Sequence, residues 1–309
     1  MTPGVGWEIP EPLSRCDVRL EDDTVTALRR YGNPDGRRLI ISHGNGLAID
    51  LYYPFWSLLV DDFDVIVYDI RNHGRNSLTP IDRHNVPTFI SDLYRILDAI
   101  DAHFGPKPRV GVYHSLSALI ALLSLSSIMA SPSSTHGPDF STLVLFDPPL
   151  YRPNVSETQF DELAELLAHR TRRRSNGFET RRDFEELVRY STSFLRVVPG
   201  VHQLMATTTL RRSADDDCFE LRCPPEYEAR IVEFVRSYAG LVDLENLPCH
   251  VKVIGADPTL PFAYLPTLDL VQMDTVDYDF LPEATHYLQL EKPAECVAAL
   301  RDFLDQAAR

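Results

Sequence analysis

Four short apolar runs in the first half of the chain constrain its fold more than any other feature. Each run is apolar along nearly its whole length, which is typical of strands covered on both faces. Segments with helical periodicity, such as 87–104, separate them. Strands that alternate with helices predict an α/β fold with a mostly parallel central sheet and helices on both faces. The runs are Leu39–Ser42, Asp64–Tyr68, Val110–Tyr113 and Thr142–Phe146, and a hairpin of Val18–Leu20 with Thr24–Arg29 is expected before them.

The pattern changes near residue 151. From there to residue 248 we find helical segments, at Glu157–Arg170, Thr180–Tyr190 and Pro225–Leu241, and no buried strand. A strand then follows at Val251–Ile254, and an amphipathic helix at Pro293–Gln306 closes the chain. We therefore expect a core domain formed by residues 1–150 and 249–309, with residues 151–248 inserted as a helical cap.

Composition excludes several classes of function. The formal net charge of −15 repels phosphate backbones, so nucleic acid is not an expected partner. No run of 18 apolar residues predicts a membrane span, and the first 15 residues lack the pattern of a signal peptide. The five cysteines are odd in number and lack metal-ligand spacing, which indicates free thiols, no metal site and a cytoplasmic location. They are Cys16, Cys218, Cys223, Cys249 and Cys296.

Ser115 lies between a predicted buried strand and an apolar helix that begins at Leu116. Such a turn lifts the side chain out of the sheet, and the start of the helix turns free N–H groups toward developing negative charge. A serine that only caps the helix fits the same local sequence. Tyr113 and Ser117 stand where this turn usually has glycines, and the large Tyr113 side chain is expected to crowd the neighbouring backbone.

A glycine-containing segment, His43-Gly44-Asn45-Gly46, follows the first buried strand. Glycines permit a sharp turn that leaves backbone N–H groups outside the sheet ladder. We expect the N–H groups of Asn45 and Leu116 to form an oxyanion hole, although an ordinary glycine turn is the alternative. Gly44, His114 and Tyr113 are expected to line the substrate pocket beside these groups.

A histidine late in the chain, His286, lies between the last predicted strand and the closing helix. A nucleophilic serine needs a base that reaches its oxygen, and histidine has a suitable pKa at neutral pH. A single histidine at such a position usually has a structural role. The position of His286 late in the chain, after Ser115, is what favours a catalytic role. His73, in the charged loop Tyr68–Asn76, is expected to be a scaffold residue instead.

Together these features resemble the α/β-hydrolase superfamily. The resemblance rests on His43-Gly-Asn-Gly, Asp69-Ile-Arg-Asn-His-Gly-Arg, the turn at Ser115 and the late His286. It covers most of residues 18–150 and 249–306 but does not extend to the segment 151–248, and it implies a triad in the order serine, acid, histidine. Ser115 is then the nucleophile and His286 its base.

The resemblance leaves two candidates for the triad acid. Asp257 follows Val251–Ile254, the usual place in the family, with a spacing one residue shorter than the common pattern. Asp147 occupies a place used by some dehalogenases and by fungal acyl-CoA hydrolases, which are also similar around Leu47–Trp56 and Leu145–Pro149. We slightly prefer Asp147 and expect the other aspartate to order a loop.

The expected function is hydrolysis of a carboxylic ester or thioester, a small-molecule substrate, through an acyl-enzyme and without a metal or organic cofactor. One alternative is non-hydrolytic chemistry on the same fold, as a lyase, C–C hydrolase or cofactor-free oxygenase. Another is a non-catalytic receptor, which the crowding expected at Tyr113 favours. A covalent adduct on Ser115 discriminates between them.

The cap carries a basic segment, His169–Arg174, followed by Arg181 and Arg182. This segment could meet an anionic substrate such as an acyl-CoA, or form a solvated helix end. Substrate identity, cap geometry and oligomeric state stay open, and an apolar cap face would suit a homodimer.

Overall fold

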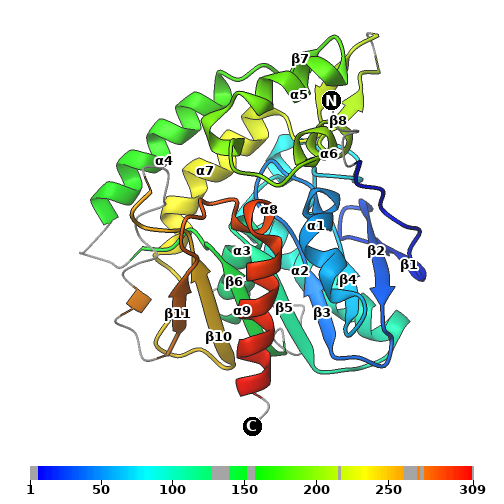
Figure 1. Ribbon diagram of the computed structural model, residues 1–309, viewed down its shortest axis with the longest axis vertical. Helices are drawn as coiled ribbons and strands as arrows, with labels where there is room; N and C mark the ends of the chain where they lie inside the picture. The colour runs from blue at the N-terminus through cyan, green and yellow to red at the C-terminus, as the bar shows by residue number, and fades with distance from the viewer. Residues whose placement is uncertain are drawn as a thin grey trace.

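The computed structural model describes residues 6–126, 139–151, 157–214, 217–260, 270–271 and 275–307. Its core is an eight-stranded sheet in the order β1-β2-β4-β3-β5-β6-β10-β11 (Figure 1). β2 is antiparallel to both neighbours, and all other pairs are parallel. The predicted mostly parallel α/β sheet is thus confirmed. The strands are β1 (Ser14–Arg19), β2 (Val25–Gly32), β3 (Arg38–Ile41), β4 (Asp64–Val67), β5 (Arg109–His114), β6 (Phe140–Phe146), β10 (His250–Gly255) and β11 (Asp277–Phe280).

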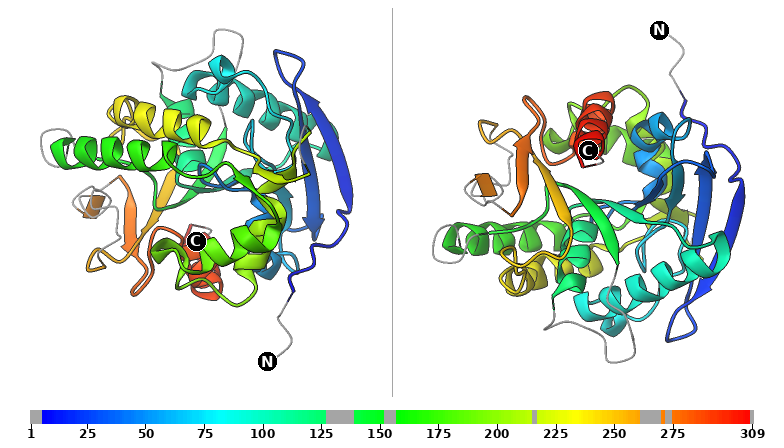
Figure 2. Two further views of the ribbon diagram at one scale, coloured as in Figure 1. Left: turned by 90° about the horizontal axis from the view of Figure 1, so that it is seen from above. Right: turned by 90° about the horizontal axis from the view of Figure 1, so that it is seen from below.

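Helices cover both faces of this sheet (Figure 2). On one face lie α2 (Val86–Phe104) and α3 (Leu116–Leu125), and on the other lie α1 (Tyr53–Trp56), α8 (Leu288–Glu291) and α9 (Pro293–Gln306). The strands are apolar throughout because successive side chains pack alternately into the two hydrophobic cores, one on each face of the sheet. In β3, for example, Ile40 packs into one core and Ile41 into the other. None of the helices in the described ranges combines the length and apolar character that a membrane span requires.

Helices α4 (Glu157–Arg172), α5 (Arg181–Arg189), α6 (Val201–Thr208) and α7 (Pro225–Ala239) lie beyond the end of the sheet where the parallel strands finish (Figure 1). They belong to the segment expected to be a helical cap. That segment also contains a three-stranded sheet of β7 (Gly177–Phe178), β9 (Phe219–Leu221) and β8 (Leu210–Arg212). We expected no buried strand here, and these short strands are only partly buried; strands of two or three residues carry too little periodicity to be seen in the sequence.

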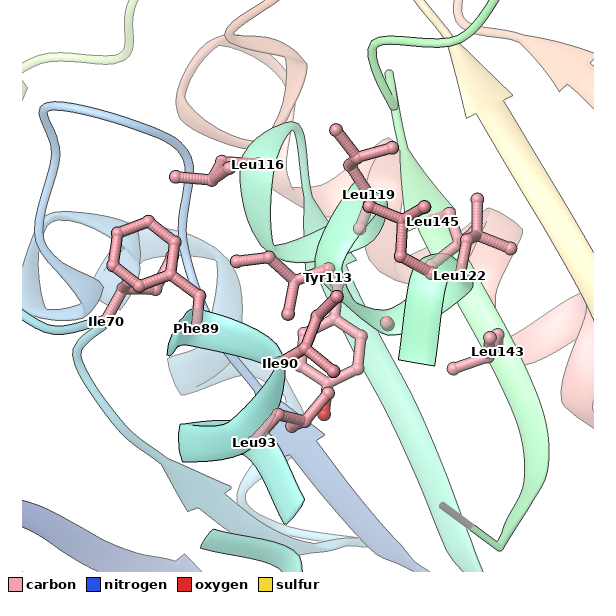
Figure 3. Packing of buried hydrophobic residues seen from close by; sticks show 14 of the residues in the cluster. Ile70, Phe89, Ile90, Leu93, Tyr113, Leu116, Leu119, Leu122, Leu143 and Leu145 are labelled. Carbon is pink, nitrogen blue, oxygen red and sulfur yellow. The ribbon is translucent and has the colours of Figure 1, made fainter. Parts of the chain in front are cut away.

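The placement of Tyr113 corrects the sequence prediction. Alternation along β5 puts Val112 on one face of the sheet and Tyr113 on the opposite face, in the core beneath α2 and α3. Its ring is fully buried near Leu93 and Leu143 (Figure 3) and does not line the cavity that Ser115 lines. The expected crowding is relieved by Gly111, where a Cβ atom would lie only 2.5 Å from the Tyr113 ring. A neighbouring glycine thus supplies the space that the large side chain needs.

Three buried histidines hold the loops that follow β3 and β4. His43 Nε2 accepts a hydrogen bond from Ile70 N–H, and His73 Nε2 accepts one from Gly46 N–H, at 3.1 and 3.0 Å. His84 lies against the His73 ring, with 5.6 Å between ring centroids. Burial lowers the pKa of His43 to about 4, of His73 to about 3 and of His84 to about 2. The loops therefore depend on histidines that stay neutral, and His73 acts as the expected scaffold residue.

We expect Gly111→Ala to lower the free energy of unfolding by about 2–3 kcal/mol, because the new methyl group overlaps the Tyr113 ring and Leu143. Chemical denaturation measures this change. Gly177→Ala is the matched control, since its Cβ would meet nothing closer than 4.0 Å and should change stability by less than about 0.5 kcal/mol. Equal stability of the two variants would contradict the account of Tyr113.

We also expect stability to fall as the pH is lowered from 7 to 5. The folded-state pKa values of these histidines lie below the unfolded value of about 6.5, so the unfolded chain binds more protons throughout this range. Each buried histidine then removes about 2 kcal/mol of stability between pH 7 and 5. Denaturation curves at both pH values should show a smaller loss in His84→Gln than in wild type. The exposed His103→Gln control should keep the wild-type loss, and the same loss in all three proteins would refute this explanation.

Candidate active site

The nucleophile candidate Ser115 ends strand β5 in a strained conformation. Its N–H donates to the carbonyl oxygen of Phe146 at 3.0 Å, so its backbone still belongs to the parallel ladder. Its φ of 50° and ψ of −113° are rare for a residue with a side chain. Helix α3 begins at the next residue, Leu116. This sharp change of direction places the Ser115 side chain on the wall of a cavity at the end of the sheet.

Asp147 repeats this arrangement on the neighbouring strand. Its N–H donates to Ile254 O at 2.9 Å, and its φ is 39°. Because His114 and Phe146 pair in the ladder, the residues that follow them, Ser115 and Asp147, leave the sheet side by side. The sheet therefore brings the two candidate triad residues to adjacent positions.

His286 completes a hydrogen-bonded chain with these residues. Its Nε2 lies 3.0 Å from Ser115 Oγ, and its Nδ1 lies 2.6 Å from Asp147 Oδ2. The other carboxylate oxygen of Asp147 accepts from Ala256 N–H at 3.1 Å. The buried aspartate can thus hold the imidazole with Nε2 facing the serine, the geometry required of a base.

The loop that carries His286 is anchored by a buried carboxylate that we did not anticipate. Glu291, in α8, accepts from the N–H and the hydroxyl of Thr285 at 2.7 and 2.5 Å. Thr285 directly precedes His286, so these bonds fix the backbone from which the imidazole projects. The sequence did not indicate this role for Glu291, because nothing local distinguishes it from other acidic residues near the end of a helix.

Asp257 does not contact His286 and orders two loops instead. Its Oδ1 accepts from the N–H and hydroxyl of Thr259 at 2.8 and 2.7 Å, and its Oδ2 accepts from Glu283 N–H at 2.7 Å. The Thr259 hydroxyl, followed by these backbone N–H groups, lowers the pKa of Asp257. The hydrogen bonds of the Asp257 carboxylate to described residues therefore all lie within these loops.

The loop after β3 lies against the Ser115 turn. A Cβ atom on Gly44 would approach His114 Nδ1 to 2.7 Å, so only glycine fits this contact. The Asn45 side chain donates to Glu228 O at 2.9 Å, and Asn45 also lines the cavity. Within the described ranges, the N–H groups of Asn45 and Leu116 donate to no protein atom. They are positioned as candidate donors to an oxyanion.

His114 links this loop to the loop of His286. Its Nε2 lies 2.8 Å from His286 O, and its Nδ1 lies 2.6 Å from the hydroxyl of Tyr52. The same hydroxyl accepts from Gly44 N–H at 3.2 Å. Burial holds the pKa of His114 well below its usual value, so the ring is neutral. Tyr52 was missed as a site residue because its partner lies 62 positions away in the sequence.

A cavity of about 350 Å³ opens above Ser115. Of the residues predicted near it, Gly44, Asn45, His114, Ser115, Leu116 and His286 all contribute to the wall, whereas Tyr113 does not. Most of the remaining wall comes from α4 and α7, which sequence patterns could not place over the sheet. In the part of the chain that is described, no cluster of His, Cys, Asp or Glu is arranged as a set of metal ligands.

Known proteins resemble this chain in sequence. A poly(3-hydroxyalkanoate) depolymerase of Ectopseudomonas oleovorans is 30% identical over 104 residues, which are 34% of this chain. The match spans about a third of the depolymerase, 36% of its length. An abhydrolase domain-containing protein of Alternaria alternata is 27% identical over 239 residues, covering 65% of this chain and 84% of that protein.

Solved structures share the fold over nearly the whole chain. An E-2-(acetamidomethylene)succinate hydrolase superposes with a TM-score of 0.73 at 17% identity, covering 94% of this chain and 99% of its own. The thioesterase domain from the curacin biosynthetic pathway gives a TM-score of 0.67 at 16% identity, covering 93% and 98%. Residues 39–299 also match the alpha/beta hydrolase family, in a span that includes Ser115, Asp147 and His286. The resemblance seen in the sequence is confirmed, and the chain belongs to the alpha/beta hydrolase family.

Proposed function

We propose that this protein is a serine hydrolase that cleaves a carboxylic ester or thioester. The proposal rests on one observation, the hydrogen-bonded chain from Ser115 through His286 to Asp147 at 3.0 and 2.6 Å. Relatives named as a depolymerase and a hydrolase support hydrolysis as the reaction. A structural neighbour named as a thioesterase domain supports the inclusion of thioesters.

In this mechanism Ser115 Oγ attacks the carbonyl carbon while His286 Nε2 takes the hydroxyl proton. The carbonyl oxygen becomes an oxyanion and accepts hydrogen bonds from the N–H groups of Asn45 and Leu116. His286 then gives its proton to the departing alcohol or thiol, which leaves an acyl group on Ser115. Water attacks this acyl-enzyme, again losing a proton to His286, and the acid is released as Ser115 regains its proton.

Asp147 holds the imidazole in this scheme and stabilises its charged form without itself taking the proton. Its pairing with Nδ1 leaves Nε2 as the atom that meets the serine. Residues 151–248 act as a cap, because α4 and α7 supply the cavity wall opposite Ser115 and so select the substrate. The remaining residues, 1–150 and 249–309, form the core that carries the reacting groups.

A fluorophosphonate probe should add once to the wild-type protein and not to Ser115→Ala. An activated serine attacks phosphorus as it attacks a carbonyl carbon, and intact-mass spectrometry measures the adduct. Ser117→Ala is the matched control, because the Ser117 hydroxyl bonds only to the backbone of His114 at 3.0 Å and does not line the cavity. Folded wild-type protein that takes no label would argue against serine hydrolysis and favour the lyase, oxygenase or receptor alternatives.

Asp147→Asn and Asp257→Asn should differ sharply in turnover of a 4-nitrophenyl ester. The first change should lower kcat by about ten-thousandfold, the loss found for the same change in a well-studied serine protease triad. The second should lower kcat by less than about tenfold, because Asp257 acts only within its loops. Losses of similar size in both variants, with circular dichroism showing both folded, would refute the role given to Asp147.

A further inference from the structure

The cavity above Ser115 has two chemically different ends. Helices α4 and α7 lie side by side and run antiparallel (Figure 2), since Arg172 at the end of α4 pairs with Glu226 at the start of α7. Where α4 begins and α7 ends, the wall is apolar. It is formed by Phe160, Leu163, Ala164, Leu167, Ile231 and Val235. The apolar groups of a substrate gain the most binding free energy when they are buried at this end.

At the other end, three charged side chains line the cavity: Arg170, Arg174 and Glu228. Arg174 forms an ion pair with the Glu228 carboxylate. Glu228 is also held in place, because its carboxylate packs over Gly46 and its carbonyl oxygen accepts from the Asn45 side chain at 2.9 Å. The charges of Arg174 and Glu228 therefore compensate each other within the protein.

Arg170 has no such partner among the described residues. The nearby Arg172 behaves differently, since it pairs with both Glu226 and Glu233 and does not line the cavity. Among the described residues, Arg170 is thus an exposed arginine that lines the cavity without an ion-pair partner, in a protein whose net charge is −15. A planar guanidinium with five N–H donors binds carboxylate and phosphate groups well, because two of its N–H groups can bond at once.

We propose that the substrate carries an anionic group, a carboxylate or a phosphate, that Arg170 binds while an apolar part lies between α4 and α7. This inference rests on the proposed hydrolase function and narrows it to amphipathic esters or thioesters. Ser115 lines the same cavity as both ends. The scissile bond in this proposal therefore joins or adjoins the apolar and anionic parts. A neutral substrate offers Arg170 no anionic partner, so the guanidinium stays hydrated. The same site therefore binds neutral substrates more weakly.

Two substrate pairs test this proposal and separate the sources of the anion. The first pair is the mono-4-nitrophenyl ester of octanedioic acid and its methyl ester, which differ by a carboxylate. The second is octanoyl-CoA and octanoyl-N-acetylcysteamine, which share the reacting thioester; only the first carries the phosphate-bearing remainder of coenzyme A. For at least one anionic member, Arg170→Gln should raise KM about tenfold and change kcat little, because a charge-assisted contact is lost. The neutral member should change by less than about twofold.

Arg173→Gln is the matched control. It removes the same charge from the same helix end, but Arg173 does not line the cavity. A general effect of removing a positive charge from the acidic protein would change KM for the anionic substrates in both variants. Loss of a specific binding contact would raise KM only in Arg170→Gln. Equal changes in the two variants, or no change for either anionic substrate, would overturn the proposal.

Binding to Ser115→Ala protein gives a readout that needs no turnover. Isothermal calorimetry with monomethyl octanedioate and with octanoyl-CoA should show weaker binding of at least one of them when Arg170→Gln is added, and unchanged binding when Arg173→Gln is added. Unchanged affinity in both double variants would reject the anion site. If esters are hydrolysed but neither anionic substrate depends on Arg170, the hydrolase function stands and this inference fails. If no ester is hydrolysed and Ser115 takes no label, the proposed function itself fails.

Discussion

The last hydrogen bonds of the parallel ladder determine the geometry of the whole site. Ser115 and Asp147 each donate their N–H to the next strand before the chain turns away, at 3.0 and 2.9 Å. Both residues adopt positive φ values, which cost about 1–3 kcal/mol each and persist only where surrounding structure enforces them. Here the ladder and the packed strands enforce them. The distance between the two side chains is therefore a property of the sheet rather than of flexible loops.

The remaining groups reach the site from loops, and buried polar contacts hold each loop in place. Glu291 fixes the loop of His286 through Thr285, and His73 fixes the loop of Asn45 through Gly46. Buried polar groups left without partners cost roughly 1–3 kcal/mol, so each of these contacts favours one loop conformation strongly. The candidate oxyanion donors are thus held in place without a ligand, which is the condition under which such donors are most effective.

Much of this arrangement could be predicted from the sequence, because local patterns carry it. Continuous apolar runs gave the parallel strands, and the strand-to-helix change located Ser115. The choice between Asp147 and Asp257 could not be settled this way, since both follow predicted strands and only strand pairing decides which one adjoins Ser115. Tyr113 was expected to line the pocket, but alternation along β5 turns its side chain into the core, where Gly111 leaves room for the ring. Tyr52 and Glu228 act through contacts between distant segments, which no local pattern encodes.

The series of hydrogen bonds from Gly44 through Tyr52 and His114 to His286 has a fixed assignment of donors and acceptors. The His286 carbonyl can only accept a hydrogen bond, so the proton of His114 must sit on Nε2. Its Nδ1 lone pair is then occupied by the Tyr52 hydroxyl, whose oxygen in turn accepts from Gly44. His114 directly precedes Ser115, but neither of its ring nitrogens has a free lone pair that could accept the serine proton. Its N–H donates to the His286 carbonyl oxygen, which cannot pass a proton on. The imidazoles of His114 and His286 lie 4.7 Å apart, and the hydrogen bonds of His114 leave this ring without a free lone pair.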